Sequence, residues 1–116
     1  MMSAPVLKEI VRQHAEMAAL LWTIYDRHLQ FPDENPDLDV QRVSWLIARI
    51  EAHLDGLVVA GAEGEAMARE RYEEYPEAGE LFVVQVLKTT KRPILVADLD
   101  PPKIRAWIAQ NLPSRE

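Results

Sequence analysis

Residues 51–61, EAHLDGLVVAG, decide the fold because they show an apolar helix that ends on a glycine. Upstream of them, apolar residues recur three and four positions apart, which is typical of a helix face that packs on a neighbouring helix. We therefore predict a helix over about residues 38–60, with Gly61 ending it in the left-handed conformation. Gly56, inside this helix, marks either a close crossing or a point of fraying. The apolar seam consists of Val40, Val43, Ile47, Ile50, Leu54 and Leu57.

A second long helix is predicted just before it, over residues 5–29. Ser3 is a candidate N-cap, and Pro5 suits the first turn. Pro32 and Pro36 cannot continue the helix, so it ends near residue 31, and Asp37 or Asp39 can cap the helix that follows. Because the connection is short, we expect the two helices to form an antiparallel hairpin. The periodic positions of the first helix are Leu7, Ile10, Val11, His14, Met17, Ala18, Leu21, Ile24, Tyr25 and His28.

The second half of the chain contains shorter segments. A charged helix is predicted over about 62–74, with a buried face made by Ala66, Met67 and Tyr72, and Pro76 after it. Residues 77–91, EAGELFVVQVLKTTK, favour a helix, although the β-branched run and the following PILVAD leave a β-hairpin open. Asp100 caps a last helix that starts on two prolines. The fold class is therefore all-α, a single helical domain with about five helices.

Composition limits the classes of function. The 116 residues include no cysteine, so disulfides and thiolate chemistry are excluded, which fits a reducing cytoplasm. The formal net charge of −6 disfavours a nucleic-acid partner. No apolar run reaches the length of a membrane span, and charges interrupt the start of the chain where a secretory leader would be apolar. Residues 81–116 carry six bases and three acids, which makes the C-terminal third basic on an otherwise acidic body.

The three histidines are the candidate polar site. The hairpin would bring His14 towards the later part of the second helix, where Glu51 and His53 lie, and we expect these three residues to form a structural polar layer. Two imidazoles and a carboxylate, or the set with His28, can also ligate a metal. No HExxH spacing supports a metal site, however, and residues 51 and 53 point to different sides of an ideal helix. We therefore predict hydrogen-bonded histidines, with no metal and no cofactor.

No pattern of residues predicts catalysis. The serines lack the strand–turn–helix context of a nucleophile elbow, and GAEG at residues 61–64 is only a turn between helices. The carboxylates of RERYEEYPEAGE are typical of a solvated face. The chain is therefore predicted not to be an enzyme. Possible interface residues are Trp45, which leans off the apolar seam, and the basic cluster of Lys88, Lys91 and Arg92.

Two stretches resemble a family of uncharacterised HEAT-repeat proteins from Gram-negative proteobacteria. They are VRQHAEMAALLWTIYDRH at residues 11–28 and RIEAHLDGLVVAG at residues 49–61, and the likeness extends over about residues 6–87. Members of that family are usually longer, with helical repeats that continue past this region. The resemblance implies a helical hairpin over 5–60 followed by short HEAT-like helices over 62–112. Family members are often encoded near type VI secretion loci, which implies adaptor or scaffold roles.

These observations together predict a cytoplasmic, non-catalytic module that binds another protein, such as a secretion component, an effector or a toxin. Its role would be that of an adaptor or scaffold linked to a type VI secretion system. Two alternatives stay open: an immunity protein that binds a cognate toxin, and a small metal- or ligand-binding protein based on its histidines. Self-association is a further expectation, because an incomplete helical solenoid leaves an apolar face uncovered.

Overall fold

The computed structural model describes residues 4–113, with side chains from residue 7 onwards. This part of the chain holds five α-helices and one short 3₁₀ helix, and no strand, which confirms the all-α prediction. The segment that could have been a hairpin is a helix, so the β alternative is wrong. The elements are α1 (Ala4–Gln30), α2 (Val40–Val59), α3 (Ala62–Glu74), α4 (Ala78–Thr89), η1 (Val96–Asp98) and α5 (Pro101–Asn111).

Side-chain caps fix two of the helix starts as predicted. The Asp39 carboxylate accepts a hydrogen bond from the backbone N–H of Arg42 at 2.9 Å, and Asp100 accepts one from Lys103 at 3.2 Å. Gly61 has the expected positive φ, 64°, but its ψ of −131° is not that of the left-handed helix. It turns the chain directly into α3 instead of closing α2, whose C-cap is Ala60. The predicted cap Ser3 lies outside the described residues.

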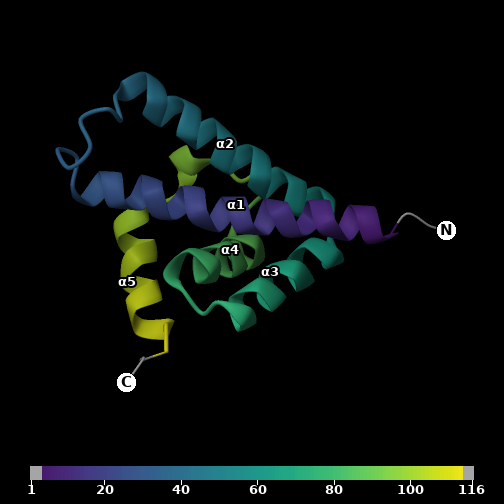
Figure 1. Ribbon diagram of the computed structural model, residues 1–116. Coiled ribbons are helices and arrows are strands. Elements are labelled where there is room, and N and C mark those ends of the chain that lie inside the picture. Colours follow the sequence, from purple (N-terminus) through teal and green to yellow (C-terminus); the bar gives the residue numbers. More distant parts are fainter. Residues whose placement is uncertain (1–3, 114–116) are drawn as a thin grey trace.

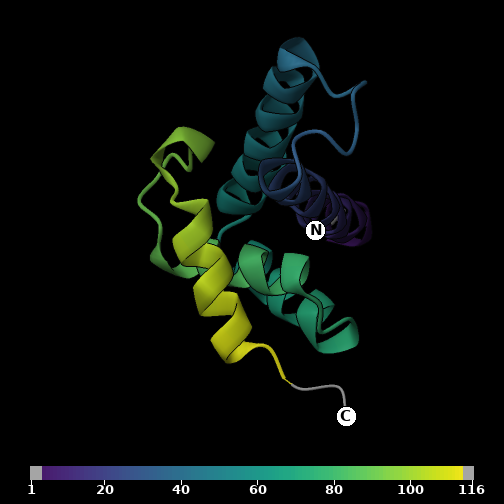
Figure 2. The same cartoon turned by 90° about the vertical axis from the view of Figure 1, so that its left-hand side faces the viewer.

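α1 is the central element, and the other helices are arranged around it (Figure 1). α2 runs back antiparallel above α1, and α3 and α4 lie below α1. α5 stands near the C-terminal end of α1, and the view turned by 90° shows it beside α4 (Figure 2). α1 and α2 form a V: they are close where α1 begins and α2 ends, and they separate towards the loop of residues 31–39. All four buried residues of α2 lie at position 46 or beyond, and within its first six residues Val43 is the partly buried residue that packs against the core.

The core is centred on the contact between α1 and α4. The Trp22 and Phe82 rings stack at a centroid distance of 4.0 Å with an interplanar angle of 4°. Small residues of α1, Ala15, Ala18 and Ala19, are buried beside them and let the helices approach closely. Trp22, with 3% of its surface exposed, is therefore a core residue.

The buried face of α1 agrees with the predicted one only in part, since Val11, Ala18, Leu21 and Tyr25 are buried as expected. Leu7, Ile10 and Ile24 belong to the periodic stripe but are exposed, because the stripe faces α2 only along part of its length. α3 and α4 cover the other side of α1, where alanines and Trp22 are buried. The buried face of α3 also differs in part from the predicted one. Met67 is buried as predicted, but Ala66 is exposed, and Gly64 and Ala68 are buried in its place.

Candidate functional site: a histidine pair and a groove between two helices

The hairpin brings two of the predicted polar residues into contact. Nδ1 of His14 on α1 lies 3.0 Å from Nδ1 of His53 on α2, and the two rings are tilted by 55° at a centroid distance of 5.2 Å. One nitrogen must carry the proton and the other must accept it, so a single proton is shared between the rings. Both side chains are half-buried. The pair joins α1 to α2 near the closed end of the V.

Gly56 is what allows the His14 ring to lie against α2. A Cβ atom at position 56 would be 2.5 Å from both Cδ2 and Nε2 of His14, which is closer than real Cβ atoms come. The glycine inside α2 therefore marks a close crossing, the first of the two readings of the sequence.

The environment of His53 disfavours its charged form. Burial lowers the pKa of His53 below its ordinary value, and the charges of His14 and Arg49 lower it further. The pair is therefore adapted to its neutral form, because a proton added to the accepting Nδ1 would leave two N–H groups facing each other with no acceptor between them.

The lowered pKa predicts a pH-dependent stability. The folded state binds a proton at His53 less readily than the unfolded chain does. The contribution of neutral His53 to the free energy of unfolding is therefore fully present above pH ~6.5 and is lost as the pH falls towards the folded-state pKa. Denaturant titrations over this range should show a free energy of unfolding that decreases as the pH is lowered. An NMR titration of His53 should have its midpoint below ~6.5. The variant His53→Asn should have a flatter profile. An equal slope in both proteins would contradict the expectation.

Glu51 does not complete the predicted polar layer. Its Oε2 accepts a hydrogen bond from the backbone N–H of Val96 at 2.8 Å, so it holds the start of η1 against α2. Residues 51 and 53 lie about 200° apart around the helix, which explains why only one of them meets His14. The prediction of a three-residue layer is therefore corrected to a pair.

His28 also lies away from the pair. It is fourteen residues beyond His14 on the same helix, about 21 Å along the axis. Its Nδ1 is buried and has no hydrogen-bond partner. Among the described residues, no group of three or more histidine or acidic side chains is placed to hold a metal ion.

A groove lies where α1 and α2 separate, and we call it the end groove. It consists of two neighbouring hollows of about 300 and 410 Å³ that share His28 and Leu38. Its walls come from the last turns of α1, the loop of residues 31–39 and the first turns of α2. The lining residues are Thr23, Ile24, Arg27, His28, Phe31, Glu34, Asn35, Leu38, Asp39, Val40, Val43 and Ser44.

Large apolar side chains are exposed along the end groove. The exposed fractions are 41% for Ile24, 48% for Phe31 and 85% for Val40. The Arg27 guanidinium lies 4.7 Å from the centroid of the Phe31 ring and forms two hydrogen bonds with Glu34, at 2.8 and 2.6 Å. The hydrogen bond to Arg27 lowers the pKa of Glu34, so this carboxylate stays ionised. The groove therefore has an apolar floor with a fixed ion pair on one side.

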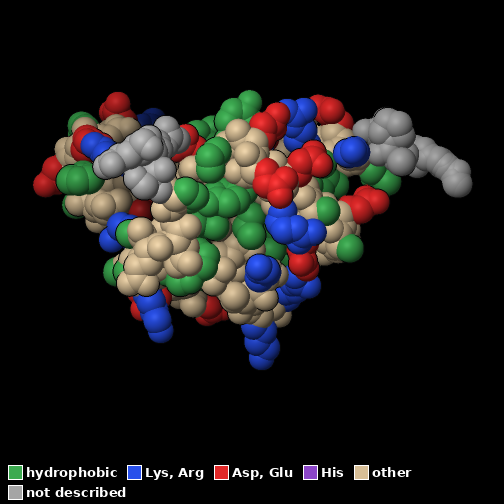
Figure 3. Space-filling view, turned by 90° about the horizontal axis from the view of Figure 1, so that it is seen from below, with side chains coloured by type: hydrophobic (Ala, Val, Ile, Leu, Met, Phe, Trp, Pro, Cys, Tyr) green, Lys and Arg blue, Asp and Glu red, His purple; other side chains and the backbone are tan. Residues whose placement is uncertain are grey.

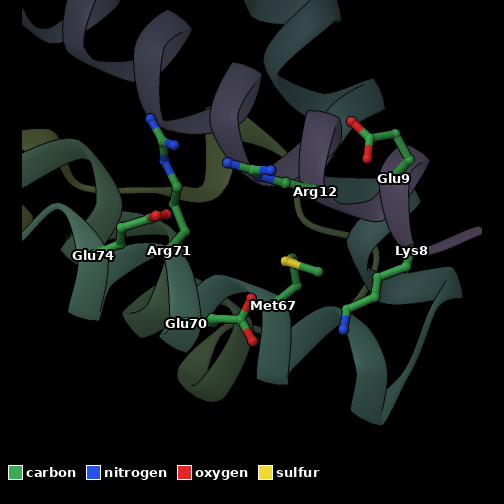
Figure 4. Close-up of a pocket in the computed structure, with 7 residues that line it drawn as sticks. All are labelled: Lys8, Glu9, Arg12, Met67, Glu70, Arg71 and Glu74. Carbon is green, nitrogen blue, oxygen red and sulfur yellow. The ribbon is translucent and has the colours of Figure 1, made fainter. Parts of the chain in front are cut away.

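A second hollow, of about 200 Å³, lies between the first half of α1 and α3 (Figure 4). Met67 lies in its middle, and charged side chains of both signs surround it. Two arginines, Arg12 and Arg71, contact Glu16 of α1 at 3.1 and 3.3 Å. Such a mixture attracts ligands of neither sign strongly. The pair of Arg71 with Glu16 joins α3 to α1, whereas the pair of Arg12 with Glu16 lies within α1. The remaining lining residues are Lys8, Glu9, Glu70 and Glu74.

Charged side chains lie at both ends of the face seen from below, and they are densest at one of them (Figure 3). Acidic and basic groups gather towards the end where α1 begins, and hydrophobic side chains gather in the middle of the same face. This arrangement places the ion pairs of the α1–α3 hollow and the apolar surface in separate regions.

The predicted interface residues occupy different places. Trp45 is 63% exposed, as its position off the seam predicted, and the Arg49 guanidinium lies 4.8 Å from its ring centroid. Lys88 and Lys91 are exposed near the end of α4. The Arg92 guanidinium already has partners within the chain, since it donates to the Leu87 carbonyl at 3.2 Å and lies 3.7 Å from the Glu65 carboxylate. The basic cluster thus lies apart from the end groove.

Comparison of the chain with known protein families, with curated proteins and with solved structures finds no match. No helix within residues 4–113 combines the length and hydrophobicity needed to cross a bilayer.

Sequence reasoning missed the end groove. Its residues were assigned to a loop and to two helix faces that were expected to pack on each other. One signal was present in the sequence. Leu38 and Val40 are apolar residues at the end of an acidic, proline-containing loop, where they can be buried only if another surface covers them. What the sequence could not provide was the angle between the two helices.

Proposed function

We propose that this chain is a non-catalytic protein-interaction module that uses the end groove as its contact surface. The supporting observation is the gathering of three exposed side chains around two neighbouring hollows, with Ile24 and Phe31 in one and Val40 in the other. Exposed apolar side chains are ordinary when they are scattered, but a contiguous group marks a site of association. Trp45, on the same helix as Val40, adds a large aromatic side chain of the kind that contributes most to interfaces.

The finer proposal is a cytoplasmic adaptor or scaffold linked to a type VI secretion system. It rests on the resemblance of the motifs around His14 and His53 to the HEAT-repeat family described above. An immunity protein that binds a cognate toxin is the second candidate, and the acidic loop beside the end groove favours it, because a basic toxin surface would find complementary charge there.

Site-specific photo-crosslinking tests the proposed surface. A photoreactive amino acid is placed at position 31 in the end groove or at position 95 next to η1, where Leu95 is exposed to a similar degree. Both proteins are produced in the cells that naturally encode the chain. We expect one discrete protein adduct from position 31 and none from position 95, and Val40→Asp should reduce that adduct at least several-fold. Equal adducts from both positions, or chaperones alone, would contradict the proposal.

Self-association is the competing reading of the same surface. In that case the adduct from position 31 would have the mass of two copies of the chain, and light scattering would show a dimer that Val40→Asp dissociates. A monomer at high concentration with a heterologous adduct supports the adaptor or immunity role.

A further inference from the structure

We propose that the end groove binds an amphipathic helix of a partner protein, with its apolar face in the groove and Lys or Arg residues facing the loop of residues 31–39. The proposal rests on the proposed function and adds the chemical nature of the partner. Three observations carry it: the shape of the groove, the spacing of its apolar residues and the charge of its rim.

The shape fits a helix. The end groove lies between two helices that diverge. It extends from residue 23 to the end of α1 and the residue that follows, which is about 12 Å along the axis or just over two helical turns. A third helix placed between two diverging helices can pack on both of them, as in ordinary helical bundles.

The spacing of the apolar wall fits it as well. Ile24, His28 and Phe31 are four and three residues apart, so they form one ridge at the end of α1, where Phe31 directly follows the helix. Val40 and Val43 form a second, three residues apart, on α2. Ridges with this spacing interlock with apolar side chains at positions i, i+3, i+4 and i+7 of a bound helix.

The rim selects a basic partner. The loop of residues 31–39 contains four acids and no base. Glu34 is paired with Arg27, Asp39 caps α2, and Arg42 donates to the backbone carbonyl of Asp37 at 2.7 Å. No described side chain hydrogen-bonds or pairs with the carboxylates of Asp33 and Asp37 themselves, so the rim keeps an excess of negative charge. Lysine or arginine residues beside the apolar face of a bound helix would neutralise them, which speeds association and fixes orientation. A second copy of this chain, with its net charge of −6, is a poorer fit.

The test uses a display library of helical peptides as the probe. Each peptide carries apolar residues at i, i+3, i+4 and i+7, with randomised flanking positions. The library is selected in parallel against the purified full chain and against the variant Phe31→Asp. The Phe31 side chain is exposed, so this variant should keep the fold. We expect Lys- and Arg-rich peptides to be enriched on the full chain only.

Two measurements then examine the enriched peptide. NMR of the labelled chain should place the shift changes at Ile24, His28, Phe31 and Val40. In anisotropy titrations, Asp33→Asn with Asp37→Asn should weaken binding about tenfold or more at low salt. The matched control, Glu73→Gln with Glu74→Gln, removes two exposed charges from α3 on the other side of α1 and should leave the affinity within about twofold, apart from screening of net charge.

Several outcomes would overturn the inference. They are enrichment without a basic bias, equal enrichment on Phe31→Asp, shift changes in the α1–α3 hollow, and loss of affinity that is the same for both pairs of substitutions. Failure of this inference is separable from failure of the proposed function. If position 31 still crosslinks one discrete protein in cells, the groove is an interaction surface whose partner is not a basic helix.

Discussion

Replacing Phe82 with alanine should lower the free energy of unfolding by about 3–5 kcal/mol. The Phe82 side chain is 1% exposed and stacks on Trp22, so its removal leaves a cavity between α1 and α4 that the surrounding helices can fill only in part. A domain of this size has a total stability of about 5–15 kcal/mol, so the change removes a large part of it. Chemical denaturation monitored by circular dichroism measures the loss.

Phe31→Ala is the matched control for this prediction. It deletes the same ring from an exposed position in the end groove and should change stability by about 0.5 kcal/mol or less. If both substitutions cost the same, the contact between α1 and α4 is not the centre of the core.

The second large effect is expected at Gly64. A Cβ atom at this position would overlap with the Leu57 carbonyl oxygen and lie 2.9 Å from its carbonyl carbon. Both atoms belong to the α2 backbone, so Gly64→Ala can be accommodated only if α3 moves away from α2. We expect a loss of about 2–3 kcal/mol despite the better helix propensity of alanine, which recovers about 1 kcal/mol.

Glu63→Ala separates this effect from propensity. It introduces alanine one residue earlier in the same turn of α3, where the side chain is exposed. Thermal unfolding should therefore give a clearly lower midpoint for Gly64→Ala and a nearly unchanged one for Glu63→Ala. A midpoint for Gly64→Ala at or above that of the unmodified chain would show that α2 and α3 are not in contact there.

The boundaries of the helices were predictable because they depend on local chemistry. Asp39 and Asp100 cap the helices that they precede, and the prolines at 32, 36 and 76 limit the others. The helix over 78–89 was the hardest to assign, since its β-branched residues suit a strand and only burial on α1 decides between the two. Local patterns cannot supply that information.

The faces of the helices were less predictable. Periodicity led to Leu7, Ile10 and Ile24, which are exposed, whereas the core also uses Ala15 and Ala19 because small residues permit close packing. The candidate site was likewise predictable in one part and not in another. The register of an antiparallel hairpin was enough to bring His14 towards His53, but the partner of Glu51 is a backbone N–H that only the folded chain brings near.

The central place of α1 has a consequence for biosynthesis. The ribosome completes α1 first, yet the surface around Trp22 gains its cover from Phe82 only after about sixty more residues have been added. At ordinary elongation rates of about 5–20 residues per second, that interval lasts roughly 3–12 s. During this time the nascent chain exposes the apolar surface around Trp22. Ribosome-associated chaperones should therefore bind it until α4 has been translated.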